Sequence, residues 1–329
     1  MTSPAPSATG ISPTARARKA SIRHLLGDYG ILLVFAAAII YLAVATPEFL
    51  TLDNLTNVVR QSSIIGFLAL GMTFVMITSG IDLSVGSTVG LVGVVAASLT
   101  PSGSGALLLP IVVGLLIGLM AGAFSAGLVV RGGVIPFLAT LAMMAILRSA
   151  ALVFTNGQPI TQLDSGFDWI GAGAVGPVPV PVILFVIAAL ILEFVLSGTA
   201  FGRHVYAVGG DEEASRNVGI SVSRVLTAVY IISGIMAATS GLVLTARVDG
   251  ADPLAGTGYE LQAISAVVIG GTSITGGTGT IRGTVVGVLL VAVVLNGMNL
   301  LNVSSYYQQA VQGVILVLAV LLNRWKSDR

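Results

Sequence analysis

A carboxylate, Asp82, stands in the stretch ITSGIDLSVGS (77–87), within a long apolar run that otherwise carries almost no charge. An ionised Asp at the centre of a bilayer costs on the order of 3 kcal/mol, so such residues face protein or water. Gly80 and Gly86 allow backbone conformations that a side chain would forbid, and Asp82 or Ser84 can cap the following helix by accepting hydrogen bonds from its first N–H groups. Three interpretations follow: a structural cap, a contact with a cytoplasmic partner, or a place in a substrate path.

Neutral amides gather near the ends of two later apolar runs. Asn296 and Asn299 are three residues apart, and Gln308 and Gln312 are four apart, so each pair lies on one side of a helix. Amides offer both donors and acceptors without charge, which suits solutes rich in hydroxyl groups. The four residues are therefore candidates for a translocation pathway, and equally for hydrogen bonds between helices.

The segment GGDEEASRNVGIS (209–221) predicts a short helix on a polar loop. Asp211 is a plausible N-cap, Glu212 and Glu213 fall in a first turn where the helix dipole favours anions, and Gly219 closes the helix. About two turns do not persist alone in water, so another element must hold them. The segment is either a solvated loop or a peg that docks on a cytoplasmic subunit through Gly210, Asp211, Glu212, Glu213, Ala214, Arg216 and Gly219.

Several kinds of chemistry are excluded by the residues present. The chain has no cysteine, which removes disulfides, zinc thiolates and thiol catalysis, and its histidines, His24 and His204, both lie in polar segments. A phosphate-binding loop needs Gly-Lys before Ser or Thr, but Lys19 follows Arg and Lys326 follows Trp. We therefore expect no metal site, no enzyme and no cofactor on this chain, and a net charge of +1 gives no sign of nucleic-acid binding.

The composition fixes the class of protein. Hydrophobic residues make up 55% of the chain and charged residues 9%, against roughly 45–50% and about 25% in a soluble domain. Runs such as VILFVIAALIL (182–192) are apolar on every face, unlike the alternating strands of a barrel. The sequence predicts an all-α polytopic membrane protein with about ten transmembrane helices, at 29–46, 55–79, 84–100, 106–130, 134–155, 179–197, 225–246, 261–275, 283–301 and 307–323.

Orientation follows from the basic residues, because cytoplasmic loops carry an excess of Lys and Arg. With the N-terminus inside, all but Arg60, Arg148 and Arg247 of the 15 basic residues fall on the inner side. Both termini are therefore expected in the cytoplasm. Residues 1–24 are expected to form a basic, disordered cytoplasmic tail, and residues 25–329 one transmembrane permease domain with a cytoplasmic coupling loop at about 198–224. The alternative for the N-terminus is a cleaved signal peptide ending near Ala45.

Small residues and a short internal match give two further expectations. Gly114, Gly118, Gly122 and Ala126 recur every four residues, a ridge that allows close helix packing within the chain or between subunits. The segment TGGTGTIRGTVVG (275–287), laid on TSGIDLSVGSTVG (78–90), shares five identities. Such a match is either chance among glycines or a trace of two related halves, as in many transporters.

Three longer stretches together carry a resemblance. GMTFVMITSGIDLSVGS (71–87), FGRHVYAVGGDEEASRNVGIS (201–221) and GTGYELQAISAVVIGGTSITGGTGTIRGT (256–284), followed by LNGMNLLNVSSYYQ (295–308), resemble the permease subunits of bacterial ABC importers for monosaccharides such as ribose. The resemblance runs from about residue 30 to the C-terminus.

That resemblance implies partners as well as a cell-membrane location. Two permease subunits, expected to be a homodimer, form the pathway in the bilayer. A cytoplasmic ABC ATPase binds and hydrolyses ATP with Mg, and an extracytoplasmic sugar-binding protein delivers the sugar. The segment 209–221 takes the place of the loop that docks on the ATPase.

Other functions stay open at this point. The same importer architecture could carry a nucleoside or a branched-chain amino acid. An ion-coupled secondary transporter should contain a membrane-embedded ionisable site, for which Asp82, Arg148 and Glu193 are marginal candidates. An intramembrane enzyme would need clustered His or carboxylates at membrane depth, which the sequence does not offer.

Overall fold

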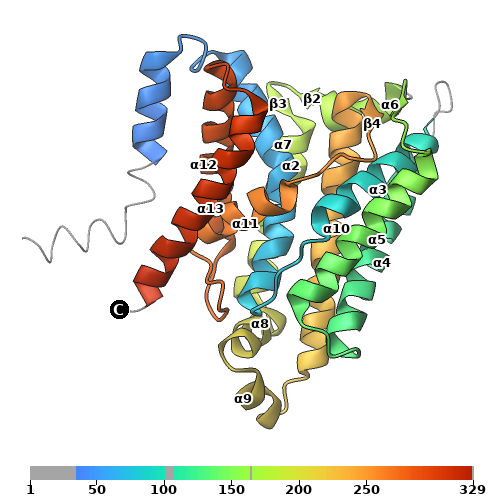
Figure 1. Ribbon diagram of the computed structural model, residues 1–329, viewed down its shortest axis with the longest axis vertical. Coiled ribbons are helices and arrows are strands. Elements are labelled where there is room, and N and C mark those ends of the chain that lie inside the picture. The colour runs from blue at the N-terminus through green and yellow to red at the C-terminus, as the bar shows by residue number, and fades with distance from the viewer. Residues whose placement is uncertain (1–34, 101–106, 164, 328–329) are drawn as a thin grey trace, which may run out of the picture.

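The computed structural model describes residues 35–100, 107–163 and 165–327. The predicted tail at 1–24 lies outside these residues. The described chain is almost entirely helical (Figure 1). Its helices are Phe35–Ala45, α2 (Leu52–Ile77), α3 (Val85–Ser98), α4 (Leu108–Val130), α5 (Pro136–Thr155), α6 (Ser165–Ala172), α7 (Val180–Gly198), α8 (Ala200–Gly210), α9 (Glu212–Asn217), α10 (Val222–Val248), α11 (Tyr259–Ile269), α12 (Ile281–Leu300) and α13 (Ser305–Ser327).

The predicted class, an all-α polytopic membrane protein, is confirmed. Within the described residues, six helices are long and apolar enough to cross a membrane: α2, α4, α5, α7, α10 and α12. Each of the ten predicted ranges overlaps a helix, and shorter apolar helices occupy the remaining four. The range 261–275 was too long, because α11 ends at Ile269 and a loop follows it.

Two helices are clearly shorter than the hydrocarbon core of a bilayer is thick. α3 has 14 residues and α11 has 11, which at 1.5 Å per residue span about 21 and 16 Å, against a hydrocarbon core of roughly 30 Å. Each is preceded by non-helical chain, residues 78–84 and 249–258. At membrane depth such backbone must find its hydrogen-bond partners inside the protein.

The partners are present for both segments. In the first, the hydroxyl of Thr140 on α5 donates to the carbonyl of Ile81 (2.9 Å), and the amide of Gly277 donates to the carbonyl of Ile77 (2.9 Å). In the second, β4 (Gly250–Ala251) pairs antiparallel with β1 (Ile160–Thr161). Nη1 of Arg148 then donates to the carbonyls of Pro253 (2.6 Å) and Ala255 (2.8 Å). Arg148 therefore stabilises the non-helical segment before α11.

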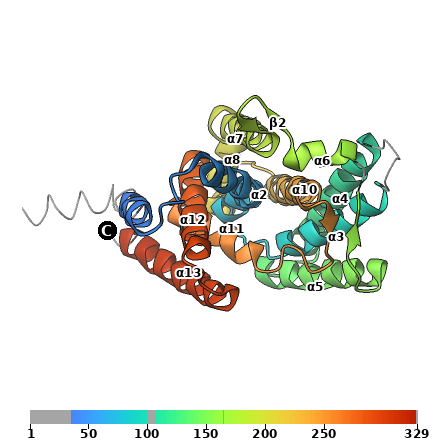
Figure 2. The same cartoon turned by 90° about the horizontal axis from the view of Figure 1, so that it is seen from above.

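The core is built around α2 and α10, which occupy the centre of the bundle (Figure 2). From Ser62 to Ile77, every residue of α2 is buried. The hydroxyl of Ser240 on α10 donates to the carbonyl of Ile64 on α2 (2.8 Å), and the ring of Phe185 on α7 meets Phe67 edge to face with centroids 5.9 Å apart. α12 joins the other side of α2 through a hydrogen bond between Thr73 and Thr284 (2.7 Å).

The predicted ridge of small residues on α4 is confirmed as a packing face within the chain. Gly114, Gly118, Gly122 and Ala126 are all buried. A Cβ at Gly118 would collide with the carbonyl oxygen of Gly234 on α10, and one at Gly122 with that of Tyr230. The two backbones are therefore in direct contact along this face, as small-residue ridges allow.

Two series of four helices, α2 to α5 and α10 to α13, have the same order of elements and run through the bundle in opposite directions. α2 to α5 run as a long central helix, a half-length helix and two full helices, and α10 to α13 run in the same order. α3 packs on α10 as α11 packs on α2, and α3 packs on α5 as α11 packs on α13. Because α2 and α10 point in opposite directions (Figure 1), the two series are inverted with respect to each other.

The sequence match between 78–90 and 275–287 does not follow this repeat. The first segment leads into α3 and the second into α12, which hold different places in the two series. The segments instead lie side by side, because the hydroxyl of Ser79 donates to the carbonyl of Thr275 (2.8 Å). Reading that match as two equivalent positions of related halves was wrong.

Candidate functional site

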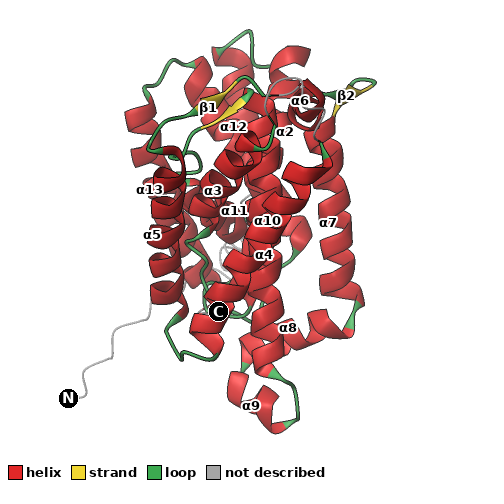
Figure 3. Cartoon of the chain, turned by 90° about the vertical axis from the view of Figure 1, so that its right-hand side faces the viewer, coloured by secondary structure: helices red, strands yellow, loops and turns green. Residues whose placement is uncertain are grey.

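One end of the molecule is formed by α8 and α9, which project beyond the bundle (Figure 3). The opposite end carries α6, the β1–β4 pair and the hairpin of β2 (Ala174–Val175) with β3 (Val178–Pro179). The charge distribution predicts the first end to be cytoplasmic.

The predicted short helix in this projecting part is confirmed as α9. Oδ1 of Asp211 accepts a hydrogen bond from the amide of Ala214 (2.9 Å), so Asp211 is the N-cap. Gly219 follows the helix with φ of +86°, a conformation that favours glycine, and the amide of Ile220 donates back to the carbonyl of Ser215 (3.0 Å).

The predicted contact residues of this segment share one property: they are exposed. These are Gly210, Asp211, Glu212, Glu213, Ala214, Arg216 and Gly219. Ser215 is the buried residue of α9. Arg216 pairs with Glu212 at 2.7 Å, but both side chains are more than half exposed, so this pair adds little stability.

The sequence missed α8, the element that holds α9 in place. Thr199 caps it by accepting from the amide of Gly202 (3.2 Å), and its buried face carries Val205 and Val208. The signal was present, since Phe201, Val205 and Val208 recur at helical spacing after a Thr.

Two contacts fix α8 beneath the bundle. The phenol of Tyr206 donates a hydrogen bond to the carbonyl of Gly279 (2.7 Å). Burial, and to a smaller extent the negative charge of Glu193, raises the pKa of this phenol, so it keeps its proton and remains a donor. At Gly209, a Cβ would collide with the carbonyl oxygen of Ile77 at the end of α2. The helix α8, which leads into α9, is therefore in direct contact with the end of α2 and with the 270–280 loop.

Asp82 is not at a surface turn, as the sequence suggested, but fully inside the protein, with 1% of its surface exposed. Its Oδ1 accepts from the amide (3.0 Å) and the hydroxyl (2.6 Å) of Ser84, and its Oδ2 accepts from the hydroxyl of Ser233 on α10 (2.7 Å). The expectation of a contact with a cytoplasmic partner was wrong for this residue, because nothing outside the chain can reach it.

The expected cap of α3 differs in detail. Ser84 occupies the N-cap position, but its hydroxyl donates to Asp82 and caps no helix N–H. The positive φ in this loop belongs to Ser79 (61°) and not to Gly80 or Gly86. Gly86 is required for packing, because a Cβ there would collide with the carbonyl oxygen of Gly256 and with Glu260.

The amide residues lie in two different settings. Asn296 exchanges two hydrogen bonds with Asn54 on α2 (2.8 and 3.1 Å) and so joins α12 to α2. This is the hydrogen bond between helices that the sequence offered as the alternative to a place in the pathway. Asn299, Gln308 and Gln312 line a cavity of about 110 Å³ at the outer end, together with Gln61, Ile64, Ile65, Leu244, Arg247, Tyr259, Gln262 and Leu295.

Glu193 has a local partner as well. Its carboxylate forms an ion pair with Nε of Arg282 (3.0 Å), which connects α7 to the start of α12. Within the described residues, no cluster of three His, Asp or Glu side chains could hold a metal ion.

Comparison with known proteins identifies one family. Residues 54–320 match the family described as branched-chain amino acid transport system / permease component. The ribose import permease protein RbsC of Escherichia coli (strain K12) is 42% identical over 318 residues, which cover 95% of this chain and 99% of that protein. RbsC of Bacillus subtilis (strain 168) is 45% identical over 291 residues, 88% of this chain and 90% of that protein.

A relative named for another sugar is nearly as similar. The D-allose transport system permease protein AlsC of Escherichia coli (strain K12) is 39% identical over 297 residues, 90% of this chain and 91% of that protein. No solved structure matches the chain.

Proposed function

We infer that this chain, which belongs to the branched-chain amino acid transport system / permease component family, is the permease subunit of an ATP-binding-cassette importer that carries a monosaccharide such as ribose. It is a multi-pass protein of the cell membrane and not itself an enzyme, since ATP and Mg belong to a separate ATPase subunit. Relatives named for ribose and for allose support a sugar as cargo.

The observation that carries this proposal is the placement of α9. It is exposed on every side except at Ser215, it is too short to be stable alone, and it is joined to the bundle by α8, which contacts the inner end of α2. This is the arrangement expected of a peg that a cytoplasmic ATPase can grip. We propose that both termini of the chain lie on this same, cytoplasmic side, as the distribution of Lys and Arg along the sequence favours.

Transport then proceeds by alternating access. ATP binding closes the two ATPase subunits, α9 follows them, and α8 passes this movement to α2 and to the 270–280 loop. The outer side opens to receive sugar from an extracytoplasmic binding protein, and hydrolysis resets the cycle.

A second copy of the chain is proposed as the other half of the pathway. Glu260 at the start of α11 and Arg148 on α5 remain partly exposed at membrane depth. Ionisable groups at that depth face protein or water and not lipid. A second permease subunit over this side would enclose these groups along a shared aqueous path.

A branched-chain amino acid is the competing cargo, because the family description names it. A zwitterion needs a carboxylate for its ammonium group as well as a cation for its carboxylate. Among the described lining residues of the outer cavity there is an arginine, Arg247, but no Asp or Glu. The cavity therefore favours an uncharged solute.

The test is a substitution of the three acids of α9. In Asp211→Ala/Glu212→Ala/Glu213→Ala, the loss of the N-cap costs about 1 kcal/mol and the anionic first turn disappears. We expect the permease to insert normally but to recover less ATPase on co-purification and to support less uptake. The matched control replaces three exposed acids of the outer side, Glu48, Asp53 and Asp252, by Ala. Equal ATPase recovery by both variants would remove the role of α9.

A further inference from the structure

The outer cavity lies where five helices converge: α2, α10, α11, α12 and α13. We propose that it is a binding site for an uncharged polyhydroxylated solute on its way through the protein, formed by Gln61, Arg247 and Gln262 as well as by Asn299, Gln308 and Gln312. The proposal rests on the importer function inferred above. It adds residues from α2, α10 and α11 that the sequence did not single out.

Gln61 indicates that this part of the bundle does not face lipid. It lies nine residues into α2, about 13 Å from its outer end, and yet it is exposed. A primary amide exposed to hydrocarbon would lose its hydrogen bonds to water without replacement. The cavity that it lines is therefore aqueous, with room for several water molecules.

The lining groups are free to bind a ligand. In the part of the chain that the structure describes, the side chains of Gln61, Gln262 and Gln312 form no hydrogen bond with the protein. Gln308 donates through Nε2 to Oδ1 of Asn299 (2.7 Å), which orients both amides. Each free amide offers two donors and one acceptor, the combination that matches a hydroxyl group.

Positive charge at the cavity excludes one class of solute. Arg247 lines it, and Arg60 is near enough to repel Arg247 electrostatically. Nε of Arg60 is itself buried without a hydrogen-bond partner among the described residues. A cationic solute in the cavity would meet the positive charge of Arg247 and, among the described lining residues, no carboxylate, whereas hydroxyl oxygens can accept from the guanidinium of Arg247.

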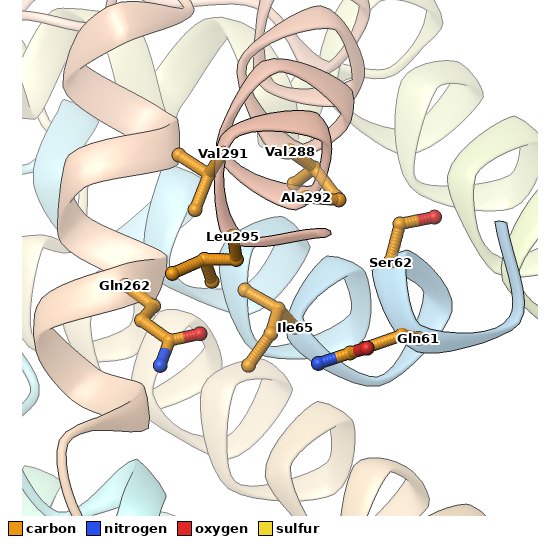
Figure 4. Close-up of a pocket in the computed structure, with 8 residues that line it drawn as sticks. All are labelled: Gln61, Ser62, Ile65, Gln262, Val288, Val291, Ala292 and Leu295. Atoms are coloured by element: carbon orange, nitrogen blue, oxygen red, sulfur yellow. The ribbon is translucent and has the colours of Figure 1, made fainter. Parts of the chain in front are cut away.

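A much smaller space borders the cavity. It has a volume of about 10 Å³, shares Ile65 and Leu295 with the cavity and is also lined by Val288, Val291 and Ala292 of α12 (Figure 4). Gln61 and Gln262 border both spaces. The smaller space holds about one water molecule, so a sugar could enter it only if α12 or α2 moved.

The absence of cysteine from the chain permits a direct test of binding. Gln61→Cys and Gln312→Cys each introduce one thiol into the cavity, and Gln309→Cys, an exposed neighbour on α13 that does not line it, is the control. The purified permease in nanodiscs is labelled with a water-soluble maleimide. We expect all three thiols to react.

Ribose should slow only the cavity thiols, by about tenfold when its concentration is ten times its dissociation constant. A cationic amino sugar at the same concentration should have no effect, and Gln309→Cys should label at one rate throughout. Cavity thiols that do not react, or that react equally fast with and without ribose, would overturn the proposal. Asn299→Cys gives a second cavity thiol if one variant does not fold.

Transport separates this inference from the proposed function. In proteoliposomes with ATPase and binding protein, Gln312→Ala should lower ribose uptake roughly tenfold while stimulated ATP hydrolysis persists, and Gln309→Ala should match the unmodified chain. Equal uptake by both variants would contradict a place for the cavity in the pathway. A complex that shows ribose-protected thiols but no ATP-driven uptake would instead contradict the importer function.

Discussion

Asp82 is a buried carboxylate in a membrane protein, and its surroundings explain how it is tolerated. Three hydrogen-bond donors from Ser84 and Ser233 converge on its two oxygens, and the phenol of Tyr230 lies close to the same loop, 2.8 Å from where a Cβ on Gly80 would be. The carboxylate thereby ties the non-helical chain before α3 to the central helix α10. Its task is to hold a bent segment in place.

Replacing Asp82 should therefore destabilise the whole bundle. Asp82→Ala leaves three buried donors without an acceptor, which we expect to cost about 2–3 kcal/mol of unfolding free energy. Asp53→Ala, at an exposed position in the first turn of α2, should cost a few tenths. Unfolding of the detergent-purified proteins measures both, and equal stabilities would contradict the structural task of Asp82.

Single residues were predictable where local spacing decides their role, and not where a distant helix does. Asp211 as N-cap and Gly219 as the closing residue follow from positions within one short segment. Asn296 and Asn299 share a helix and a residue type, but Asn296 meets Asn54 on α2 and Asn299 faces the cavity. The burial of Asp82 likewise depends on Ser233, some 150 positions later in the chain.

At the scale of the elements, close backbone contact between α4 and α10 fixes the centre of the bundle. Gly118 and Gly122 on α4 meet Gly234 and Tyr230 on α10 without intervening side chains. Packing of this kind depends on surfaces that fit and not on hydrophobic area, since lipid is as apolar as the helices.

Adding a methyl group to α4 should push it away from α10 at Gly118 and leave stability unaffected at Gly127. In Gly118→Ala, the new Cβ meets the backbone of Gly234, which cannot move without α10, so we expect a loss of about 1–3 kcal/mol. In Gly127→Ala, on the same helix, no atom lies within 4 Å, and the better helix propensity of Ala should leave stability unchanged or slightly raised. Thermal unfolding in detergent compares the two, and a Gly118→Ala protein as stable as Gly127→Ala would rule out the close contact.

Element positions could be predicted from hydropathy, but element lengths could not. All ten predicted ranges overlap helices, because each is an apolar run between polar breaks. Apolar chain that is not helical has the same hydropathy, so the loop after Ile269 was assigned to a helix. The amphipathic helix α8 was missed for the opposite reason, since it lies in a polar segment.

At the scale of the whole molecule, the two inverted series of helices explain how a small movement could open opposite sides in turn. The half-length helices α3 and α11 begin within the bundle and run in opposite directions, and each packs on the central helix of the other series. Since α8 contacts the inner end of α2, we expect a displacement at α9 to reach the central helix through α8. These contacts support the proposal that the chain passes the movement of a partner ATPase to its central helices.

The central claim is that this chain is a gate driven by a partner's ATP hydrolysis. The most direct test is accumulation of radiolabelled ribose in sealed liposomes that contain the purified chain, with and without the ATPase, the binding protein and ATP. We predict accumulation above the outside concentration only when all components are present, and none with the chain alone under any ion gradient. Accumulation by the chain alone would show that it couples transport to another energy source and would contradict this account.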